Sequence, residues 1–479
     1  MGSAAPFPTI AEIAPEIAEG RITATSLIDE AFARIAADDR QGANLGAIIR
    51  VNPEADADAR ALDAERARSG VRGPLHGLPV VIKDNIDVYG LPTSSGCIAL
   101  AAAMPRRDAE QTRRLRAAGA IILAKTNMSE LSFEIRSRSS IGGDVRNPFN
   151  PSVTAGGSSG GTAAAVAAGF AMAGLGTDTG GSIRTPAAYN GLVGFRPTHG
   201  LIDTSGTAPL APTADTVGPI ARSVEDAVLL AELMIGVRFG SWRAEGGLLP
   251  TLRGRRIGVL WQAFGACEEI ARACNAALAE GARAGAVLEP ISLAEDVLPT
   301  CPVDIVDHEF ASAFDTYLQT NFISGAPHSL AQIVRSSAHL PEYRQAMERR
   351  VRAQDVNAYE VLQTRRNVLK MALQDTMDAY RLDAMAYPTS AVFPTSLENP
   401  DGGWASELAA YSGRPAITLP VGRASNGVPI GLELLGCRFG DNDLLLIAAA
   451  VEQVTDYRYT PDLCCPSATV TQPPEARRV

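Results

Sequence analysis

The sequence has no excess of positive charge and no long basic run. Its 479 residues include 43 lysines and arginines against 53 aspartates and glutamates, which gives a formal net charge of -10. Binding to nucleic acid or to an anionic membrane surface requires a concentrated patch of positive charge. We therefore expect neither a nucleic-acid partner nor a membrane partner, and a small neutral ligand fits the composition better.

The cysteines follow neither a disulfide pattern nor a metal-binding pattern. There are seven, an odd number, and no two have the CxxC spacing of a zinc site. Their positions are scattered along the chain: Cys97, Cys267, Cys274, Cys301, Cys437, Cys464 and Cys465. We interpret them as reduced thiols of a cytoplasmic protein, and we expect no metal and no other cofactor.

Targeting signals and membrane-spanning segments are also missing from the sequence. No basic residue precedes Arg21, no apolar signal-peptide core is present, and the MGSAAP start lacks the hydroxyl residue of a myristoylation motif. Residues 147–177 contain no charge, but they are rich in Pro, Gly, Ser and Ala and are too weakly apolar to cross a bilayer. We expect a buried helix there.

Helix and strand patterns alternate along the chain. Residues 9–38 have apolar side chains at helical spacing, whereas 78–82 and 120–124 are short apolar runs typical of buried strands. Further strands are expected at 255–261, 383–389, 414–422 and 429–436, helices at 268–284 and 355–380, and loops at 203–219 and 388–403. This alternation predicts an α/β fold with a mixed central β-sheet surrounded by helices.

The first of two glycine-framed serine motifs is GGSSGG at 156–161. Gly156 to Gly160 satisfy G-x-S-x-G, the nucleophile elbow, in which a strand must immediately precede the serine. The preceding NPFNPSVTA has two prolines and is more typical of a loop. None of the five histidines lies in a recognisable catalytic context, so a serine–histidine mechanism has little support.

The second motif, Thr179-Gly180-Gly181-Ser182, lies 24 residues further on. Successive backbone N–H groups with little side-chain obstruction can form an oxyanion hole, and Ser182 lies among them. Each motif alone is equally compatible with a glycine turn between a helix and a strand.

Together the two motifs fit one longer pattern: GGSSGG, small residues, Asp178, GGSIR and Pro186-Ala187. This pattern resembles the amidase signature family. The resemblance extends to PLHGLPVVIKDNIDV, AKTNMSELS, NGLVGFRPTHG, SGRPAITLPVG and GVPIGLELLG, and it is weakest over residues 235–350. It implies the amidase signature fold.

The resemblance implies a Ser-Ser-Lys triad in which Ser182 is the nucleophile, Ser158 the bridging hydroxyl and Lys83 the base. It also implies a cis peptide bond between Gly157 and Ser158. The expected oxyanion-hole donors are the backbone N–H groups of Thr179, Gly180, Gly181 and Ser182. Met128 and Gly157 are the expected substrate contacts.

The proposed base is chemically reasonable because burial favours the uncharged form of lysine. Lys83 follows the apolar run 78–82, so its neutral amine could accept a proton from Ser158, which relays the proton of Ser182. The alternative is an exposed ion pair with Asp84. Ser159 is a rival for Ser158 on chemistry alone. We expect Asp178 and Arg184 to pair across the nucleophile turn as scaffold.

The resemblance implies one domain over residues 1–479. Its expected parts are N-terminal helices at 1–60, the catalytic core at 70–230, a variable substrate-side region at 235–350, and strands and a helix at 380–465 that complete the sheet. The expected pocket walls are 128–133, 203–213 and parts of 305–345. The recurring aromatic residues Phe310, Phe314, Tyr317 and Phe322 are interpreted as core.

The function expected from the family is hydrolysis of the carbon–nitrogen bond of small neutral amides or carbamates through an acyl-enzyme, with water as the second substrate. One alternative is the glutaminase subunit of a tRNA-dependent amidotransferase, which needs partner subunits, although residues 326–366 lack the glycine- and tyrosine-rich pattern expected of it. Another is a catalytically silent binding protein, which the presence of all three triad residues disfavours. The sequence is also compatible with a homodimer.

Overall fold

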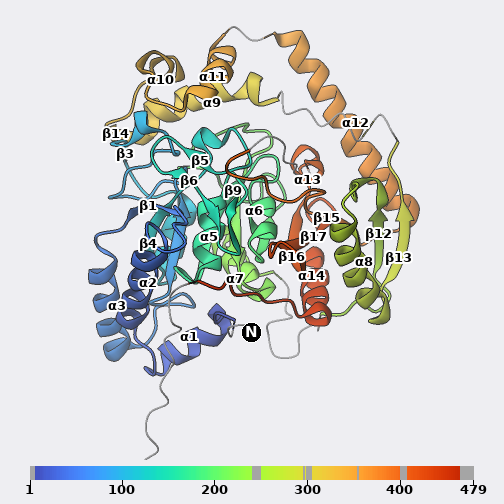
Figure 1. Ribbon diagram of the computed structural model, residues 1–479, viewed down its shortest axis with the longest axis horizontal. Coiled ribbons are helices and arrows are strands. Elements are labelled where there is room, and N and C mark those ends of the chain that lie inside the picture. The colour runs from blue at the N-terminus through green and yellow to red at the C-terminus, as the bar shows by residue number, and fades with distance from the viewer. Residues whose placement is uncertain are drawn as a thin grey trace, which may run out of the picture.

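A mixed sheet of eleven strands forms the centre of the protein (Figure 1). The computed structural model describes residues 6–239, 250–294, 297, 305–352, 355–399 and 407–463. In sheet order the strands are β1 (Ile48–Val51), β4 (Ile121–Thr126), β2 (Pro79–Lys83), β9 (Ala173–Asp178), β11 (Thr216–Ala221), β10 (Val193–Arg196), β16 (Ala416–Arg423), β17 (Pro429–Gly436), β15 (Ala384–Pro388), β12 (Arg256–Leu260) and β13 (Val287–Ile291). Strand β2 is parallel to β4 and β9, and β12 is parallel to β13 and β15, whereas the remaining pairs are antiparallel.

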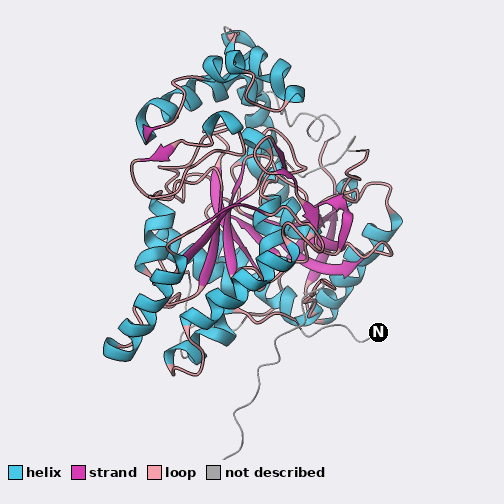
Figure 2. Ribbon diagram, turned by 60° about the vertical axis from the view of Figure 1, so that its left-hand side comes forward, coloured by secondary structure: helices cyan, strands magenta, loops and turns pink. Residues whose placement is uncertain are grey.

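Helices cover both faces of this sheet (Figure 2). They are α1 (Ile10–Ala18), α2 (Ala24–Asp38), α3 (Ala55–Ser69), α4 (Glu110–Ala117), α5 (Gly160–Ala167), α6 (Arg184–Tyr189), α7 (Val224–Ile235), α8 (Glu268–Arg283), α9 (Ile305–Asn321), α10 (Leu330–Ser336), α11 (Arg344–Val351), α12 (Val356–Tyr380), α13 (Leu408–Ser412) and α14 (Asp441–Thr455). The fold is therefore the predicted single α/β domain with a mixed central sheet.

The central strands are apolar throughout because side chains on both of their faces are buried. Successive side chains of a strand point to opposite faces. Val80 and Ile82 of β2 accordingly belong to one apolar cluster, which includes side chains of α1, α4 and α7. Val81 belongs to a second cluster, formed with side chains of α2, α3 and α5. Lys83 lies two residues beyond Val81 and therefore extends toward the α5 face.

Two of the predicted loops contain strands. The predicted loop 203–219 ends in β11, which begins at Thr216 and pairs with β9. The segment before GGSSGG contains β8 (Asn150–Thr154), which pairs only with β7 (Arg146–Asn147) in a separate ribbon. A two-stranded ribbon consists of edge strands, which tolerate a proline such as Pro151, so the sequence disguised this strand.

Helices α9, α10, α11 and α12 form an arch beyond one end of the central strands (Figure 1). Phe310, Phe314 and Tyr317 of α9 are buried and stack on one another, which confirms their interpretation as core. Two further ribbons are formed by β3 (Met104–Pro105) with β14 (Phe322–Ser324) and by β5 (Arg138–Ser139) with β6 (Gly143–Asp144). Within the described ranges, no helix combines the length and apolarity needed to cross a membrane. The cytoplasmic location stays a prediction.

Candidate active site

The site lies where β2 and β9 end. These strands are parallel neighbours, so their carboxyl ends meet at the same edge of the sheet. Lys83 is the last residue of β2, and Asp178 is the last residue of β9. The chain then turns through residues 179–183 into α6, which gives Ser182 a strand–turn–helix setting. The elbow geometry that G-x-S-x-G suggested for GGSSGG is therefore found around Ser182, on a strand of the main sheet.

Lys83 is fully buried and makes two short hydrogen bonds. Its Nζ lies 2.7 Å from Ser158 Oγ and 2.7 Å from Thr177 Oγ1. Burial lowers the pKa of Lys83 from 10.5 to about 7, although the charges of Asp178 and Asp215 act in the opposite direction. A substantial fraction of the amine is therefore neutral near pH 7, as a proton acceptor must be.

The alternative of an exposed ion pair between Lys83 and Asp84 is wrong. Lys83 has no exposed surface, and Asp84 instead forms a buried ion pair of 3.2 Å with Lys125 of β4. Asp84 also accepts hydrogen bonds from the backbone N–H groups of Ser94 and Gly96. Because side chains alternate along the chain, the neighbouring residues Lys83 and Asp84 face different surroundings.

The structure separates the two serines of GGSSGG. Ser158 Oγ is the hydrogen-bond partner of Lys83, and the Gly157–Ser158 peptide bond is cis, as the family resemblance implied. Ser159 Oγ donates to the carbonyl oxygen of Thr177 and accepts from its N–H, both at 3.3 Å. The hydroxyl of Ser159 is thus occupied by strand β9, and only Ser158 is placed beside the lysine.

Ser182 lies in the adjoining turn. Its backbone carbonyl accepts a hydrogen bond of 3.2 Å from Ser159 N–H, which ties the two glycine-rich turns together. The side chain is 7% exposed and lines a small cavity, and its hydroxyl has no hydrogen-bond partner among the described residues. Lys83 and Ser158 are therefore in direct contact, whereas Ser182 stands next to them with its hydroxyl unpaired.

The expected oxyanion donors differ in their availability. Within the described ranges, the N–H groups of Gly180 and Ser182 have no protein acceptor. The N–H of Gly181 instead donates to Asp178 Oδ1 at 3.0 Å, and the positive φ of 110° at this glycine allows the chain to turn toward the carboxylate. Gly181 thus departs from the expected role, because its N–H is already bound.

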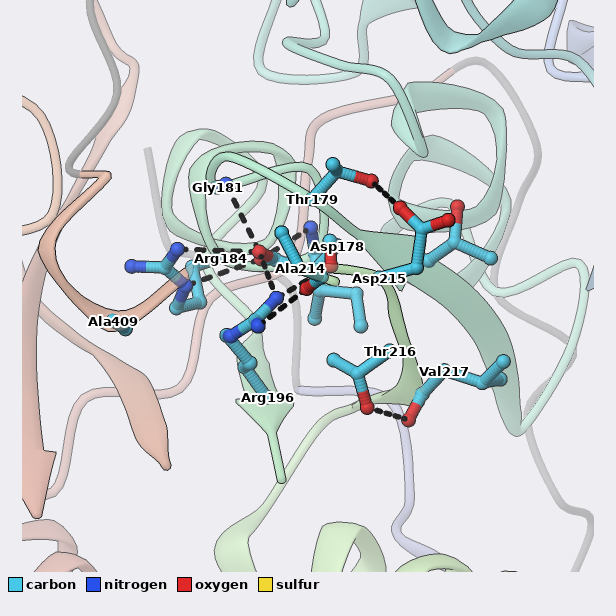
Figure 3. A network of polar contacts seen from close by, with 12 residues as sticks. Asp178, Thr179, Gly181, Arg184, Arg196, Ala214, Asp215, Thr216, Val217 and Ala409 are labelled. Atoms are coloured by element: carbon cyan, nitrogen blue, oxygen red, sulfur yellow. Dashed lines mark hydrogen bonds and ion pairs between the residues drawn. The ribbon is translucent and has the colours of Figure 1, made fainter. Parts of the chain in front are cut away.

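Asp178 is the centre of a buried charge network beneath this turn (Figure 3). Its carboxylate forms ion pairs with Arg184 at 3.1 Å and with Arg196 at 2.9 Å, and it also accepts from Ile183 N–H. Burial alone would raise the pKa of Asp178, but the two guanidinium groups and the N–H donors hold it well below its usual range. The predicted Asp178–Arg184 pair is confirmed as a contact.

The sequence did not reveal the other members of the network. Arg184 also contacts Glu433 of β17, whose carboxylate accepts a hydrogen bond of 2.9 Å from the Tyr387 hydroxyl. Burial raises the pKa of Glu433 to about 7, while Arg184 opposes this rise. A single charged residue within an apolar strand was the available signal, because a buried charge needs a partner.

The two expected substrate contacts are both packed inside the protein. Met128 is fully buried and belongs to neither cavity described below. A Cβ atom added to Gly157 would lie 2.7 Å from the backbone carbon of Ile135 and 2.8 Å from the nitrogen of Arg136. Gly157 is therefore needed for close backbone packing, and its contact with a substrate stays a prediction.

Two cavities meet beside Ser182. The smaller, of about 80 Å³, contains Ser182 and Gly180 together with Phe133, Tyr411, Arg350 and other residues. The larger, of about 650 Å³, is enclosed by the loop 204–217, by α9 and by the start of α12. Ser132, Thr179 and Leu210 line both. The walls include parts of all three predicted segments, and also Asp355, Val356 and Tyr359, which the sequence analysis missed.

The described residues offer no alternative catalytic group. None of the five histidines has a hydrogen bond with Ser158, Ser159 or Ser182 in this part of the chain. No group of three or more His, Cys, Asp or Glu side chains is arranged there to hold a metal ion. The four cysteines that are described, Cys97, Cys267, Cys274 and Cys437, are free thiols.

An α/β fold that places a buried lysine against a serine, beside a second serine in a glycine-rich turn, is typical of a serine hydrolase that uses lysine instead of histidine. A family model described as Amidase matches residues 27–445. The chain belongs to the amidase signature family, and it is an amidohydrolase.

Known proteins of the family match nearly the whole chain. The A-type component of the glutamyl-tRNA(Gln) amidotransferase of Moorella thermoacetica is 34% identical, over 87% of this chain and 91% of that protein. Mandelamide hydrolase of Pseudomonas putida is 32% identical, over 95% and 92%. The crystal structure of peptide amidase from Stenotrophomonas maltophilia has 33% identity, covers 95% of this chain and 99% of that one, and superposes with a TM-score of 0.86.

Proposed function

We propose that the protein hydrolyses an amide through an acyl-enzyme on Ser182, with Ser158 as the bridging hydroxyl and Lys83 as the base. The contact of 2.7 Å between Lys83 Nζ and Ser158 Oγ carries this proposal, because the lysine is buried and has no carboxylate partner in the described structure. A buried amine without a counter-ion is a base at neutral pH instead of a fixed positive charge.

The proton moves along this contact in both directions. Neutral Lys83 takes the proton of Ser158, and Ser158 takes that of Ser182 as its oxygen attacks the carbonyl carbon. The backbone N–H groups of Gly180 and Ser182, with Thr179 at the edge of the turn, hold the developing oxyanion. The proton then returns through Ser158 to the leaving nitrogen, and the same groups activate water to release the acid.

Glutamine is the first candidate substrate, and the amidotransferase relatives favour it. Their name describes a component of an enzyme that amidates glutamyl-tRNA(Gln), a reaction that needs a nitrogen donor. The small cavity beside Ser182 supports this candidate. Arg350 contributes a buried Nη1 without a hydrogen-bond partner, and Glu134 and Glu407 also line the cavity. A guanidinium and carboxylates are the charges that an α-amino acid requires.

With glutamine as substrate, the acceptor of the released ammonia would be a tRNA-bound group on partner subunits. The net charge of -10 then means that positive charge for tRNA has to come from those partners.

A small amide without an amino-acid head group is the second candidate. Mandelamide hydrolase and peptide amidase, two relatives of similar identity, are named for such substrates. Phe133, Tyr411 and Val306 give the cavity beside Ser182 an apolar part that suits an aryl or alkyl acyl group. Carbamates belong to the same proposal, because their carbonyl carbon is attacked in the same way.

The decisive experiment compares three alanine variants on two substrates. Ser182→Ala and Ser158→Ala should each abolish hydrolysis of phenylacetamide or glutamine, whereas Ser159→Ala, the matched control, should retain it. Mass spectrometry after rapid acid quench should detect an acyl adduct on the peptide that contains Ser182. Turnover by Ser182→Ala would refute the assignment of the nucleophile. Glutamine hydrolysis that appears only with partner subunits would select the first candidate, and phenylacetamide hydrolysis by the chain alone the second.

A further inference from the structure

We propose that the larger cavity binds a protonated amine at the far end of the leaving group, with the carboxylates of Asp215 and Glu309 and the amide oxygen of Asn85 as its acceptors. This inference rests on the proposed amide hydrolysis. It specifies a class of substrate for that site: amides whose leaving amine carries a second, cationic nitrogen.

The cavity has negative charge without matching positive charge on its wall. Its described lining contains the carboxylates of Asp215, Glu309 and Asp355 and the imidazole of His308, but no lysine or arginine. None of these three carboxylates forms an ion pair in the described part of the chain. The nearest basic group is Arg366, which lies behind the wall and donates to Thr213. The field inside the cavity therefore attracts a cation.

Unpaired polar atoms gather on the same wall. Asn85 is 3% exposed, and its Oδ1 has no hydrogen-bond partner. Thr207 Oγ1 and His308 Nδ1 are also buried without partners, and all three residues line this cavity. Buried polar atoms are nearly always paired, so three unpaired ones around a single cavity indicate a polar ligand.

The orientation of Asn85 makes its free atom an acceptor. Its Nδ2 donates to Thr177 Oγ1 at 3.0 Å, which leaves the carbonyl oxygen unpaired. Carboxylates and an amide oxygen only accept hydrogen bonds, whereas a primary ammonium group donates three. The donor and acceptor pattern therefore fits an amine better than a phosphate or a carboxylate.

The carboxylate of Glu309 is held in position before a ligand arrives. It accepts hydrogen bonds from Thr213 N–H at 3.0 Å, from Thr213 Oγ1 at 2.6 Å and from the Tyr359 hydroxyl at 2.9 Å. Asp215 is fixed in the same way by Thr179 Oγ1 at 2.5 Å and by the N–H groups of Leu210 and Ala211 (Figure 3). Charges fixed in this way lose little freedom when a ligand binds.

The cavity lies on the leaving-group side of Ser182. The proton for the leaving nitrogen comes from Lys83 through Ser158, so that nitrogen must lie on the lysine side. Lys83 Nζ also contacts Thr177 Oγ1, and Thr177 lines the larger cavity but not the smaller one. The apolar acyl group is then left with the smaller cavity, which holds Phe133 and Tyr411.

A matched pair of substrates tests this inference. N-(5-aminopentyl)phenylacetamide and N-hexylphenylacetamide have the same acyl group and nearly the same length, and only the first carries a positive charge. Wild-type kcat/KM should be at least about tenfold higher for the charged amide, as expected of a charge-assisted hydrogen bond. Added salt should reduce this ratio, because it screens the attraction.

Two variants locate the effect in the cavity. Glu309→Gln should lower the charged-to-neutral ratio of kcat/KM toward one, whereas Glu360→Gln, an exposed position on α12, should keep it. The ratio is taken within each variant, so a general loss of activity cancels. Equal kcat/KM for both amides, or a ratio that Glu309→Gln leaves unchanged, would overturn the inference. Hydrolysis of phenylacetamide but of neither longer amide would overturn it as well. Absence of hydrolysis of phenylacetamide and of glutamine would instead refute the proposed function.

Discussion

Replacing Lys83 by methionine should abolish hydrolysis and yet stabilise the fold at pH 7. The protein contains two fully buried lysines on neighbouring parallel strands, Lys83 on β2 and Lys125 on β4, which makes the second a matched control. Lys125 is paired with Asp84 at 3.2 Å, whereas Lys83 has only hydroxyl partners among the described residues. The two substitutions should therefore have opposite effects on stability.

The size of the effect follows from the pKa of Lys83. The group has a pKa of 10.5 when unfolded and of about 7 in the fold, so the unfolded chain binds more protons between these two values. Stability rises with pH wherever the unfolded chain binds more protons, so the lysine destabilises the fold below pH 10.5, increasingly down to about pH 7. At 1.36 kcal/mol per pKa unit, the cost is about 4 kcal/mol at pH 7 and about 2 kcal/mol at pH 9.

Methionine removes this cost but also removes two hydrogen bonds, which together stabilise the fold by roughly 1–2 kcal/mol. The net gain for Lys83→Met is then about 2–3 kcal/mol at pH 7 and close to zero at pH 9. With an unfolding entropy of about 2.1 cal/mol/K per residue, a chain of 479 residues gains about 1 °C in Tm per kcal/mol. Lys125→Met leaves the Asp84 carboxylate buried alone and should lower Tm by roughly 3–5 °C.

Differential scanning fluorimetry of the wild type and both variants at pH 7 and pH 9 measures these shifts. Lys83→Met should melt about 2–3 °C above the wild type at pH 7, and this difference should shrink toward zero at pH 9. A lower Tm for Lys83→Met at pH 7, or a difference that does not depend on pH, would refute the reasoning. Lys83 would then be a charged, structurally paired residue like Lys125.

Three further predictions concern the same site. The kcat/KM for a neutral amide should rise with pH through about 7, because Lys83 accepts a proton only when it is neutral, and a flat profile between pH 6 and 8 would contradict this. Ser158→Ala should lower kcat by at least about 100-fold, but Ser159→Ala by less than about tenfold; equal losses would show that the two hydroxyls are interchangeable. Arg196→Met leaves Asp178 with one guanidinium and should lower Tm by roughly 3–5 °C, whereas a shift below about 1 °C would mean that Arg184 alone balances the charge.

The elements that the sequence predicted correctly are those with strong local patterns. Short apolar runs predicted β2 and β4, and helical spacing predicted α2, α8 and α12 within one or two residues. The sheet order could not be predicted, because pairings such as β10 with β16 join segments more than two hundred residues apart. Strand β8 was missed because a ribbon outside the main sheet tolerates the proline that a central strand excludes.

The candidate site divides in the same way. The family resemblance supplied the register of Lys83, Ser158 and Ser182, and the apolar run before Lys83 predicted its burial. Sequence alone could not separate Ser158 from Ser159, because both are hydroxyls in one glycine-rich turn and only the position of β9 decides which of them meets the lysine. It could not find Arg196 or Glu433 either, because their partners are distant in the chain.

The buried charges explain how the lysine can be neutral so close to carboxylates. Asp178 and Asp215 are the two acids whose charges favour protonated Lys83. Asp178 is held by Arg184 and Arg196, and Asp215 by Thr179 and backbone N–H groups. A carboxylate already paired with guanidinium groups exerts a weaker net field on a third group. The arginines therefore position the nucleophile turn and also limit the charge felt by the base, so that burial of Lys83 prevails.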